Sequence, residues 1–106
     1  MILIVFFDLP VKTKKQKRAA CLFRKYLLKD GFFMMQFSVY ARISKNYSLL
    51  EKHINRIEKN APKEGSIKTI IITKEQYNSM KELIGNNKHF ININKNYKNS
   101  SKIIYL

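Results

Sequence analysis

The sequence predicts one α+β domain, and three observations support this fold class. An unbroken apolar run opens the chain at residues 2–7, capped amphipathic stretches have the spacing of helices, and β-rich segments lie between and after them. At 106 residues the chain is long enough for a single domain with one core. Hydrophobic residues make up 45% of it, which indicates a folded domain and not a basic tail.

The opening run predicts a strand that is buried on both of its faces. It is too short to span a membrane. The strand ends near Asp8, because Pro10 cannot donate a hydrogen bond to a neighbouring strand. Asp8 is therefore predicted at the tip of a rigid central strand.

Three amphipathic stretches predict helices over residues 14–30, 49–60 and 74–84. Each follows a Ser or Thr that has a Gln or Glu three positions later, which is the pattern of a capping box. The three pairs are Thr13 with Gln16, Ser48 with Glu51, and Thr73 with Gln76. Gly31 and Gly85 suit the left-handed backbone that ends many helices. We expect the third helix to bury Tyr77, Met80 and Ile84.

The remaining β-rich segments predict the rest of a sheet. Residues 32–43 are long enough to bend into two strands, although no Gly or Pro marks a turn there. Residues 65–73 predict another strand, which we expect to form the central pair of the sheet with the first strand. Residues 86–101 are rich in Asn, Lys and Ser and predict a connector, and residues 102–106 predict a short C-terminal strand.

This order of elements predicts a ferredoxin-like fold, the split βαβ arrangement βαββαβ, with an extra C-terminal helix and strand. Residues 1–85 would form the domain, and the first two helices would cover one face of an antiparallel sheet. Something must then cover the other face, and a second copy of the chain is the simplest choice. We therefore expect a homodimer through the sheet face, with the C-terminal strand pairing across it.

The charge of the chain predicts a nucleic-acid partner. The chain carries 21 Lys and Arg against 7 Asp and Glu, a formal net charge of +14, which favours phosphate neutralisation and counterion release. The first helix places four cations opposite its apolar residues: Lys14, Arg18, Lys25 and Lys29. These side chains suit successive phosphates of a duplex, bound without reading its sequence. The alternative is a solvated helix face.

Targeting signals and cysteines predict the compartment. No apolar run reaches transmembrane length, and the N-terminus lacks the basic region and cleavage site of a signal peptide. Cys21 is the sole cysteine, which excludes an internal disulfide, and we expect it to be buried in the first helix. These features predict a cytoplasmic protein with no membrane partner.

Two short motifs resemble a known family. Phe-Asp-Leu-Pro at residues 7–10 and Gln-Phe-Ser-Val-Tyr at residues 36–40, at this spacing in so short a chain, are similar to the small CRISPR-associated adaptation protein Cas-two (Cas2). The helix segment at residues 23–28, Gly31-Phe32, Gly65, Thr73 and Gln76-Tyr77 also fit. The resemblance covers residues 1–85 and the apolar end at residues 103–106, in the form found beside single-effector systems.

The resemblance implies a homodimer of ferredoxin-like subunits. Such a dimer would bridge two dimers of the CRISPR adaptation integrase (Cas-one) and hold duplex DNA for insertion as a spacer. The resemblance also implies a metal-dependent endonuclease that acts on RNA or DNA. The family's acid at the end of the first strand corresponds to Asp8, and the polar residue of its second β segment corresponds to Ser38.

Asp8 has two interpretations. Two copies, one from each protomer, could hold one magnesium or manganese ion, since magnesium is commonly bound by one or two carboxylates with water and phosphate oxygens. The metal would polarise a phosphodiester and activate an attacking water. The alternative is a turn, because an Asp side chain before Leu-Pro accepts nearby amide hydrogens. No other acid lies in the matching segments, so we expect a weak or conditional nuclease rather than an efficient one.

Three further residues are candidates for phosphate contacts. Ser38 could orient a phosphate or a metal-bound water, or bond to backbone as an ordinary strand residue. Arg42, at the end of the β segment, is a second phosphate candidate. Arg24 is a weaker candidate, with packing or pairing near the dimer seam as its alternative.

The aromatic and histidine residues receive simpler interpretations. Phe37 and Tyr40 are expected in core or dimer packing rather than stacked on bases. His53 and His89 have no partner at the spacing of metal ligands, so neither is assigned a role.

The leading hypothesis is a dimeric, sequence-tolerant DNA-binding subunit of the CRISPR adaptation complex that acts as a scaffold. The rival is a magnesium-dependent endonuclease whose site is the Asp8 pair, and a third is a toxin-like RNA-cleaving relative on the same fold. The scaffold needs the basic helix and survives loss of Asp8, whereas both enzyme hypotheses need Asp8 and a divalent metal.

Overall fold

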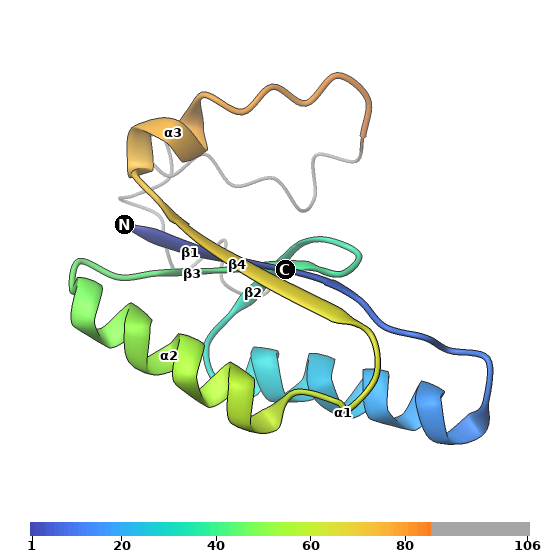
Figure 1. The fold of residues 1–106 in the computed structure, drawn as a ribbon. Coiled ribbons are helices and arrows are strands. Elements are labelled where there is room, and N and C mark those ends of the chain that lie inside the picture. The colour runs from blue at the N-terminus through green and yellow to red at the C-terminus, as the bar shows by residue number, and fades with distance from the viewer. Residues whose placement is uncertain (86–106) are drawn as a thin grey trace.

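The computed structural model describes residues 1–85 and confirms the α+β class (Figure 1). The elements follow the chain in the order β1 (Ile2–Asp8), α1 (Lys14–Lys29), β2 (Phe33–Gln36), β3 (Val39–Ile43), α2 (Tyr47–Asn60), β4 (Ser66–Ile72) and α3 (Lys74–Asn78). Among these residues no helix is long and apolar enough to cross a membrane. The predicted connector, the C-terminal strand and His89 lie outside the described residues.

The strands form one antiparallel sheet in the order β2-β3-β1-β4, which is the predicted ferredoxin-like topology. The expectation that β1 and β4 form the central pair is wrong, because β1 and β3 are central and β4 is an edge strand. The β2–β3 hairpin places β3 along one edge of β1, and β4, which returns after α2, pairs with the other edge of β1. The apolar run in β4 therefore does not indicate burial between two strands.

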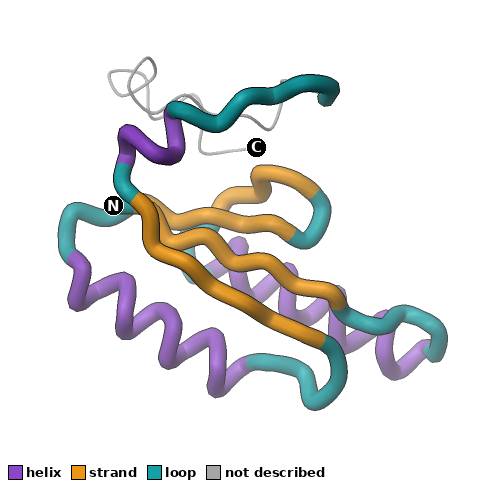
Figure 2. The backbone as a smooth tube through the Cα atoms, turned by 45° about the horizontal axis from the view of Figure 1, so that its top comes forward, coloured by secondary structure: helices purple, strands orange, loops and turns teal. Residues whose placement is uncertain are grey.

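Both long helices cover the same face of the sheet, as Figures 1 and 2 show. Leu3, Val5 and Phe7 of β1 point toward them and pack with the buried residues of α1 and α2, which include Phe23 and Leu50. The Phe7 ring meets the Phe23 ring edge to face, with centroids 5.1 Å apart. This geometry adds aromatic attraction to the burial of apolar area.

The start of α1 confirms its predicted cap, whereas the start of α2 does not. The Thr13 hydroxyl accepts from the Gln16 amide at 3.0 Å, and the Gln16 side chain accepts from the Thr13 amide at 3.1 Å. Helix α2 begins earlier than predicted, because Asn46 is its cap and accepts from the Leu49 amide at 3.3 Å. Ser48 is therefore inside the helix. Asn caps a helix as well as Ser does, so sequence preference alone did not separate the two positions.

Helix α3 has the predicted Thr73 capping box but ends at Asn78, well short of residue 84. Its last turn closes on Ser79, whose hydroxyl donates to the Gln76 carbonyl at 2.7 Å. That bond competes with continued helix, as serine side chains often do. Ile84 was expected on the buried helix face, yet it is 97% exposed.

The second face of the sheet, opposite α1 and α2, is partly covered. Ile2 and Ile4 of β1 form a buried cluster there with Ala41 and with Tyr77 of α3. The first two helices cover one face as predicted, and the extra helix α3 partly covers the other face at this end of the sheet. Toward the Asp8 end of β1 this face of the sheet is more exposed to solvent, and Phe6 is 42% exposed.

Cys21 is exposed on α1, so the expectation that it is buried is wrong. Only Ala20, Phe23 and Leu27 of this helix are buried. The helix turns a narrow apolar stripe to the core, and position 21 lies outside that stripe.

Candidate nucleic-acid interface

Asp8 is exposed at the end of β1, on the second face of the sheet. It lies opposite Ser66 of β4 in the antiparallel register. A shallow depression of about 360 Å³ surrounds it, which we call the strand-end depression. Its lining residues are Phe6, Phe7, Asp8, Phe37, Ser38, Val39, Ser66 and Lys68.

The β2–β3 turn brings Ser38 to the same depression. Ser38 has a φ of +65°, a left-handed conformation that is uncommon for a residue other than glycine. Its carbonyl accepts a hydrogen bond from the Phe7 amide at 3.0 Å, which fastens the turn beside the end of β1. The predicted residues Asp8 and Ser38, separated by 30 positions in the chain, thus line the same depression.

Gly65 supports Asp8 from the other side. Its φ is +102°, and a Cβ added there would lie 2.7 Å from the Asp8 carbonyl oxygen. Any other residue at this position would be strained by its backbone conformation and would collide with β1. The chain therefore constrains the backbone on both sides of Asp8.

The depression supplies one carboxylate from this chain. Within residues 1–85 no three acidic, histidine or cysteine side chains come together as a metal site. The two ion pairs of that range both belong to Asp30, so Asp8 is not engaged in one. A single accessible carboxylate fits magnesium, which commonly takes one or two protein carboxylates and completes its shell with water and phosphate.

The basic face of α1 lies on the other side of the molecule. Lys14, Arg18, Lys25 and Lys29, here called the basic helix face, are all exposed. They extend over about 22 Å at the rise of an α-helix, and no acidic residue interrupts α1. Because α1 covers the face of the sheet opposite Asp8, one straight duplex cannot contact both surfaces of the same chain (Figure 1).

Arg42 makes a contact that the sequence did not indicate. Its Nη1 donates to the Asp30 carbonyl at 2.7 Å, just past the end of α1. A side chain on Gly31, which has a φ of +92°, would overlap the Arg42 guanidinium. Arg42 thus satisfies a carbonyl at the helix end, where a cation also complements the helix dipole.

Arg24 lies over the Phe7 ring, with its guanidinium carbon 5.9 Å from the ring centroid. This distance suits a cation–π contact. Within the described part of the chain its buried Nε has no hydrogen-bond partner. The packing alternative for Arg24 therefore has a specific contact in the structure.

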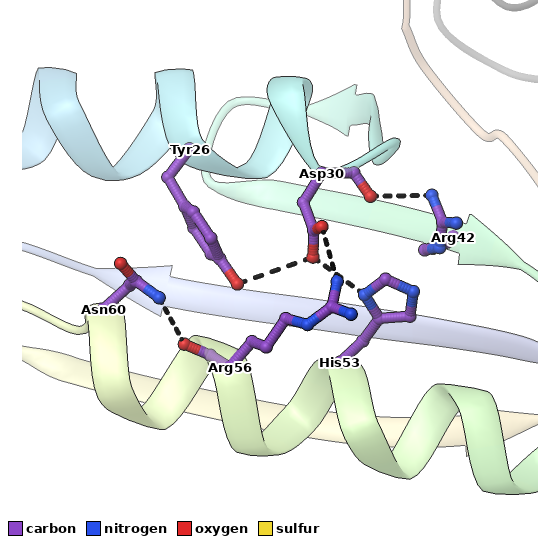
Figure 3. Close-up of polar contacts among 6 residues, drawn as sticks. All are labelled: Tyr26, Asp30, Arg42, His53, Arg56 and Asn60. Carbon is purple, nitrogen blue, oxygen red and sulfur yellow. Dashed lines mark hydrogen bonds and ion pairs between the residues drawn. The ribbon is translucent and has the colours of Figure 1, made fainter.

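Asp30 forms a polar cluster that ties α1 to α2 (Figure 3). Its carboxylate lies 2.7 Å from His53 Nδ1, accepts from Arg56 at 3.0 Å and is 3.5 Å from the Tyr26 hydroxyl. The His53 side chain is only 3% exposed. Burial, followed by the nearby Asp30 charge, raises the pKa of Tyr26 above its ordinary value. His53 was assigned no role in the sequence analysis, because its partner lies 23 positions away along the chain.

The fold and these two surfaces define a class: small basic ferredoxin-like domains with a cationic first helix and a carboxylate at the end of the first strand. Residues 1–80 match the family model described as CRISPR associated protein Cas2, and the chain belongs to that family. The match includes both motifs on which the resemblance was based, so the predicted family is confirmed.

Known relatives agree with this assignment. A protein from Acidovorax ebreus is 47% identical over 85 residues, which are 80% of this chain and 83% of the relative. One from Treponema denticola is 43% identical over 88 residues, 83% of this chain and 87% of the relative. One from Ligilactobacillus salivarius is 41% identical over 85 residues, 80% of this chain and 84% of the relative. All three are named CRISPR-associated endoribonuclease Cas2.

Proposed function

We propose that this chain is a dimeric, sequence-tolerant nucleic-acid-binding subunit of the CRISPR adaptation complex. In this role it bridges dimers of the adaptation integrase and holds duplex DNA. The observation that carries the proposal is the basic helix face, a row of exposed cations on a helix without a single acid. Cations placed this way neutralise phosphates and release counterions whatever the base sequence.

The second face of the sheet supports a dimer. Phe6, Ile43 and Ile70 are each more than two-fifths exposed there. A second copy would remove this apolar area from water, at roughly 25 cal/mol per Å². Sedimentation should then give about twice the chain mass of 12.6 kDa. A folded monomer at micromolar concentration would contradict the dimer.

A second function is a magnesium-dependent endonuclease at Asp8, with manganese as an alternative ion. The names of the relatives favour it, as does the position of Asp8 and Ser38 on the same depression. A bound metal would polarise the phosphodiester and activate water. Asp8 from each protomer would hold the ion, and the Ser38 hydroxyl would orient a phosphate oxygen. RNA is the substrate in the toxin-like version of this function, and DNA is the alternative.

One experiment separates the two functions. Spacer acquisition is measured with the integrase and either Asp8→Asn or the quadruple alanine variant of the basic helix face. We expect Asp8→Asn to retain acquisition, because holding DNA uses cations and not the carboxylate. The quadruple variant should lose acquisition while remaining a dimer. If Asp8→Asn abolished acquisition in an intact dimer, the scaffold proposal would fail and Asp8 chemistry would be essential.

A further inference from the structure

The aromatic side chain of Phe37 is almost fully exposed to solvent. It stands at the tip of the β2–β3 turn and is 84% exposed, whereas Phe7, Phe23 and Phe32 are all buried. The backbone beside it is constrained, because Ser38 adopts a left-handed conformation and its carbonyl accepts from the Phe7 amide. An uncovered aromatic face on a constrained turn is a surface on which a planar ring can stack.

Lys68 brings a positive charge to the same place. It is exposed on β4 and lies opposite Phe6 in the register, two residues from the position opposite Asp8. Asp8 and Lys68 are the two charged residues that line the strand-end depression. A phosphodiester brought to Asp8 would meet a like charge, and Lys68 is the lining residue that can offset that repulsion.

We propose that Phe37 and Lys68 form a nucleotide subsite of the strand-end depression. Phe37 stacks on a base, and Lys68 binds the phosphate attached to it, so that the adjoining phosphodiester lies at Asp8. Bases inside a duplex have both faces covered by their neighbours, so the subsite favours an unpaired nucleotide of any sequence. This inference rests on the proposed cleavage function of Asp8, and it assigns both residues as positioning residues for that reaction.

The test measures affinity for short single-stranded oligonucleotides in the Asp8→Asn background, which prevents cleavage. The variants are Phe37→Ala, the aromatic replacement Phe37→Trp, and Tyr47→Ala as a matched control on an exposed aromatic residue of α2. Stacking predicts that Phe37→Ala weakens binding by roughly tenfold. Phe37→Trp and Tyr47→Ala should leave it unchanged.

A second ligand separates the contribution of base stacking from that of phosphate binding. An abasic oligomer with the same number of phosphates offers nothing to stack on, so Phe37→Ala should not weaken its binding. Lys68→Gln should weaken binding of both ligands and flatten the salt dependence by about 0.7 per lost single-strand phosphate contact. An oligonucleotide carrying 2-aminopurine should lose fluorescence on binding the parent protein, and Phe37→Ala should restore it.

Three results would overturn the subsite. These are unchanged affinity in Phe37→Ala, equal weakening for the abasic oligomer, and conversion of the dimer to a monomer, which would make Phe37 an interface contact. Cleavage is assayed separately with Asp8 restored. If cleavage survives in Asp8→Asn while the stacking results hold, the proposed endonuclease fails and nucleotide binding by Phe37 stands.

Discussion

The basic helix face and the strand-end depression lie on opposite sides of the sheet and differ in construction. The basic helix face repeats one kind of side chain along about 22 Å of regular helix, and no single residue of it occupies a special conformation. The depression depends on single residues held by unusual backbone, with Ser38 at φ +65° and Gly65 at φ +102°. Charge spread over a helix suits binding, whereas a fixed carboxylate suits chemistry at one bond.

This difference predicts how each surface tolerates change. Loss of one cation from the basic helix face removes one phosphate contact of several. Loss of Asp8 removes the carboxylate of the depression altogether. The predictions below test whether the two surfaces are independent, beginning with the largest expected effect.

Asp8→Asn keeps the shape of the side chain and removes its charge. Cleavage that requires magnesium or manganese should fall by roughly a hundredfold or more, since even residues that merely support a metal ligand cost ten- to a hundredfold. Duplex affinity should not decrease, because the basic helix face is untouched. Cleavage is followed on end-labelled RNA and DNA. Full activity in the variant would place the nuclease at another site or in a contaminant.

Replacing Lys14, Arg18, Lys25 and Lys29 by Ala should flatten the salt dependence of duplex binding. The slope of log affinity against log salt should change by up to roughly 3.6, at about 0.9 per phosphate. The melting temperature should change little, because all four side chains are exposed.

The matched control for this variant removes four exposed lysines elsewhere, by the substitutions Lys45→Ala, Lys52→Ala, Lys59→Ala and Lys63→Ala. It lowers the net charge by the same amount. If it flattens the slope equally, binding depends on overall charge and the basic helix face is not a distinct site.

Asp30→Ala should destabilise the folded domain, because Asp30 links α1 to α2. It leaves the buried His53 Nδ1 without its 2.7 Å partner, and a buried polar group left without a hydrogen bond costs roughly 1–3 kcal/mol. Urea unfolding measures the loss, with Glu58→Ala as a control on an exposed acid of α2. Equal, small effects of the two substitutions would show that the cluster contributes little to stability.

Tyr40→Phe should give the smallest effect, visible only in alkali. Burial raises the pKa of Tyr40, and the nearby Arg24 lowers it to a lesser extent. The folded protein keeps the phenol proton at a pH where the unfolded chain loses it, so this stabilisation is present below about pH 10 and disappears as the pH rises further. The unfolding free energy of Tyr40→Phe should therefore fall less steeply above pH 10 than that of the parent. The half-exposed Tyr47 provides the control Tyr47→Phe.

Local sequence patterns correctly predicted the start and buried face of α1 and the end of β1. The Thr13 capping box sets the start of α1 through residues three positions apart, and the spacing of Phe23 and Leu27 sets its buried face. Asp8 was placed correctly at the end of β1 because Pro10 follows it. Each of these features depends on neighbours in the chain.

Local sequence patterns did not predict contacts between residues that are far apart in the chain. Arg42 reaches Asp30 across 12 positions and His53 reaches it across 23, and neither pair has a spacing that favours contact. The contacts of Asp30 with His53 and Arg56 depend on how α1 and α2 pack, which no local pattern contains. The same reason explains the wrong position of β4, since strand order depends on the path of the whole chain.

The central position of β1 also affects how the protein folds during its synthesis on the ribosome. Ile2 pairs with Ile72 of β4, which is synthesised 70 positions later. At about 5–20 residues per second, Ile2 waits roughly 4 to 14 s for this strand partner. During that time its apolar side chain lacks the β4 contact, and slow codons before residue 72 would lengthen the exposure.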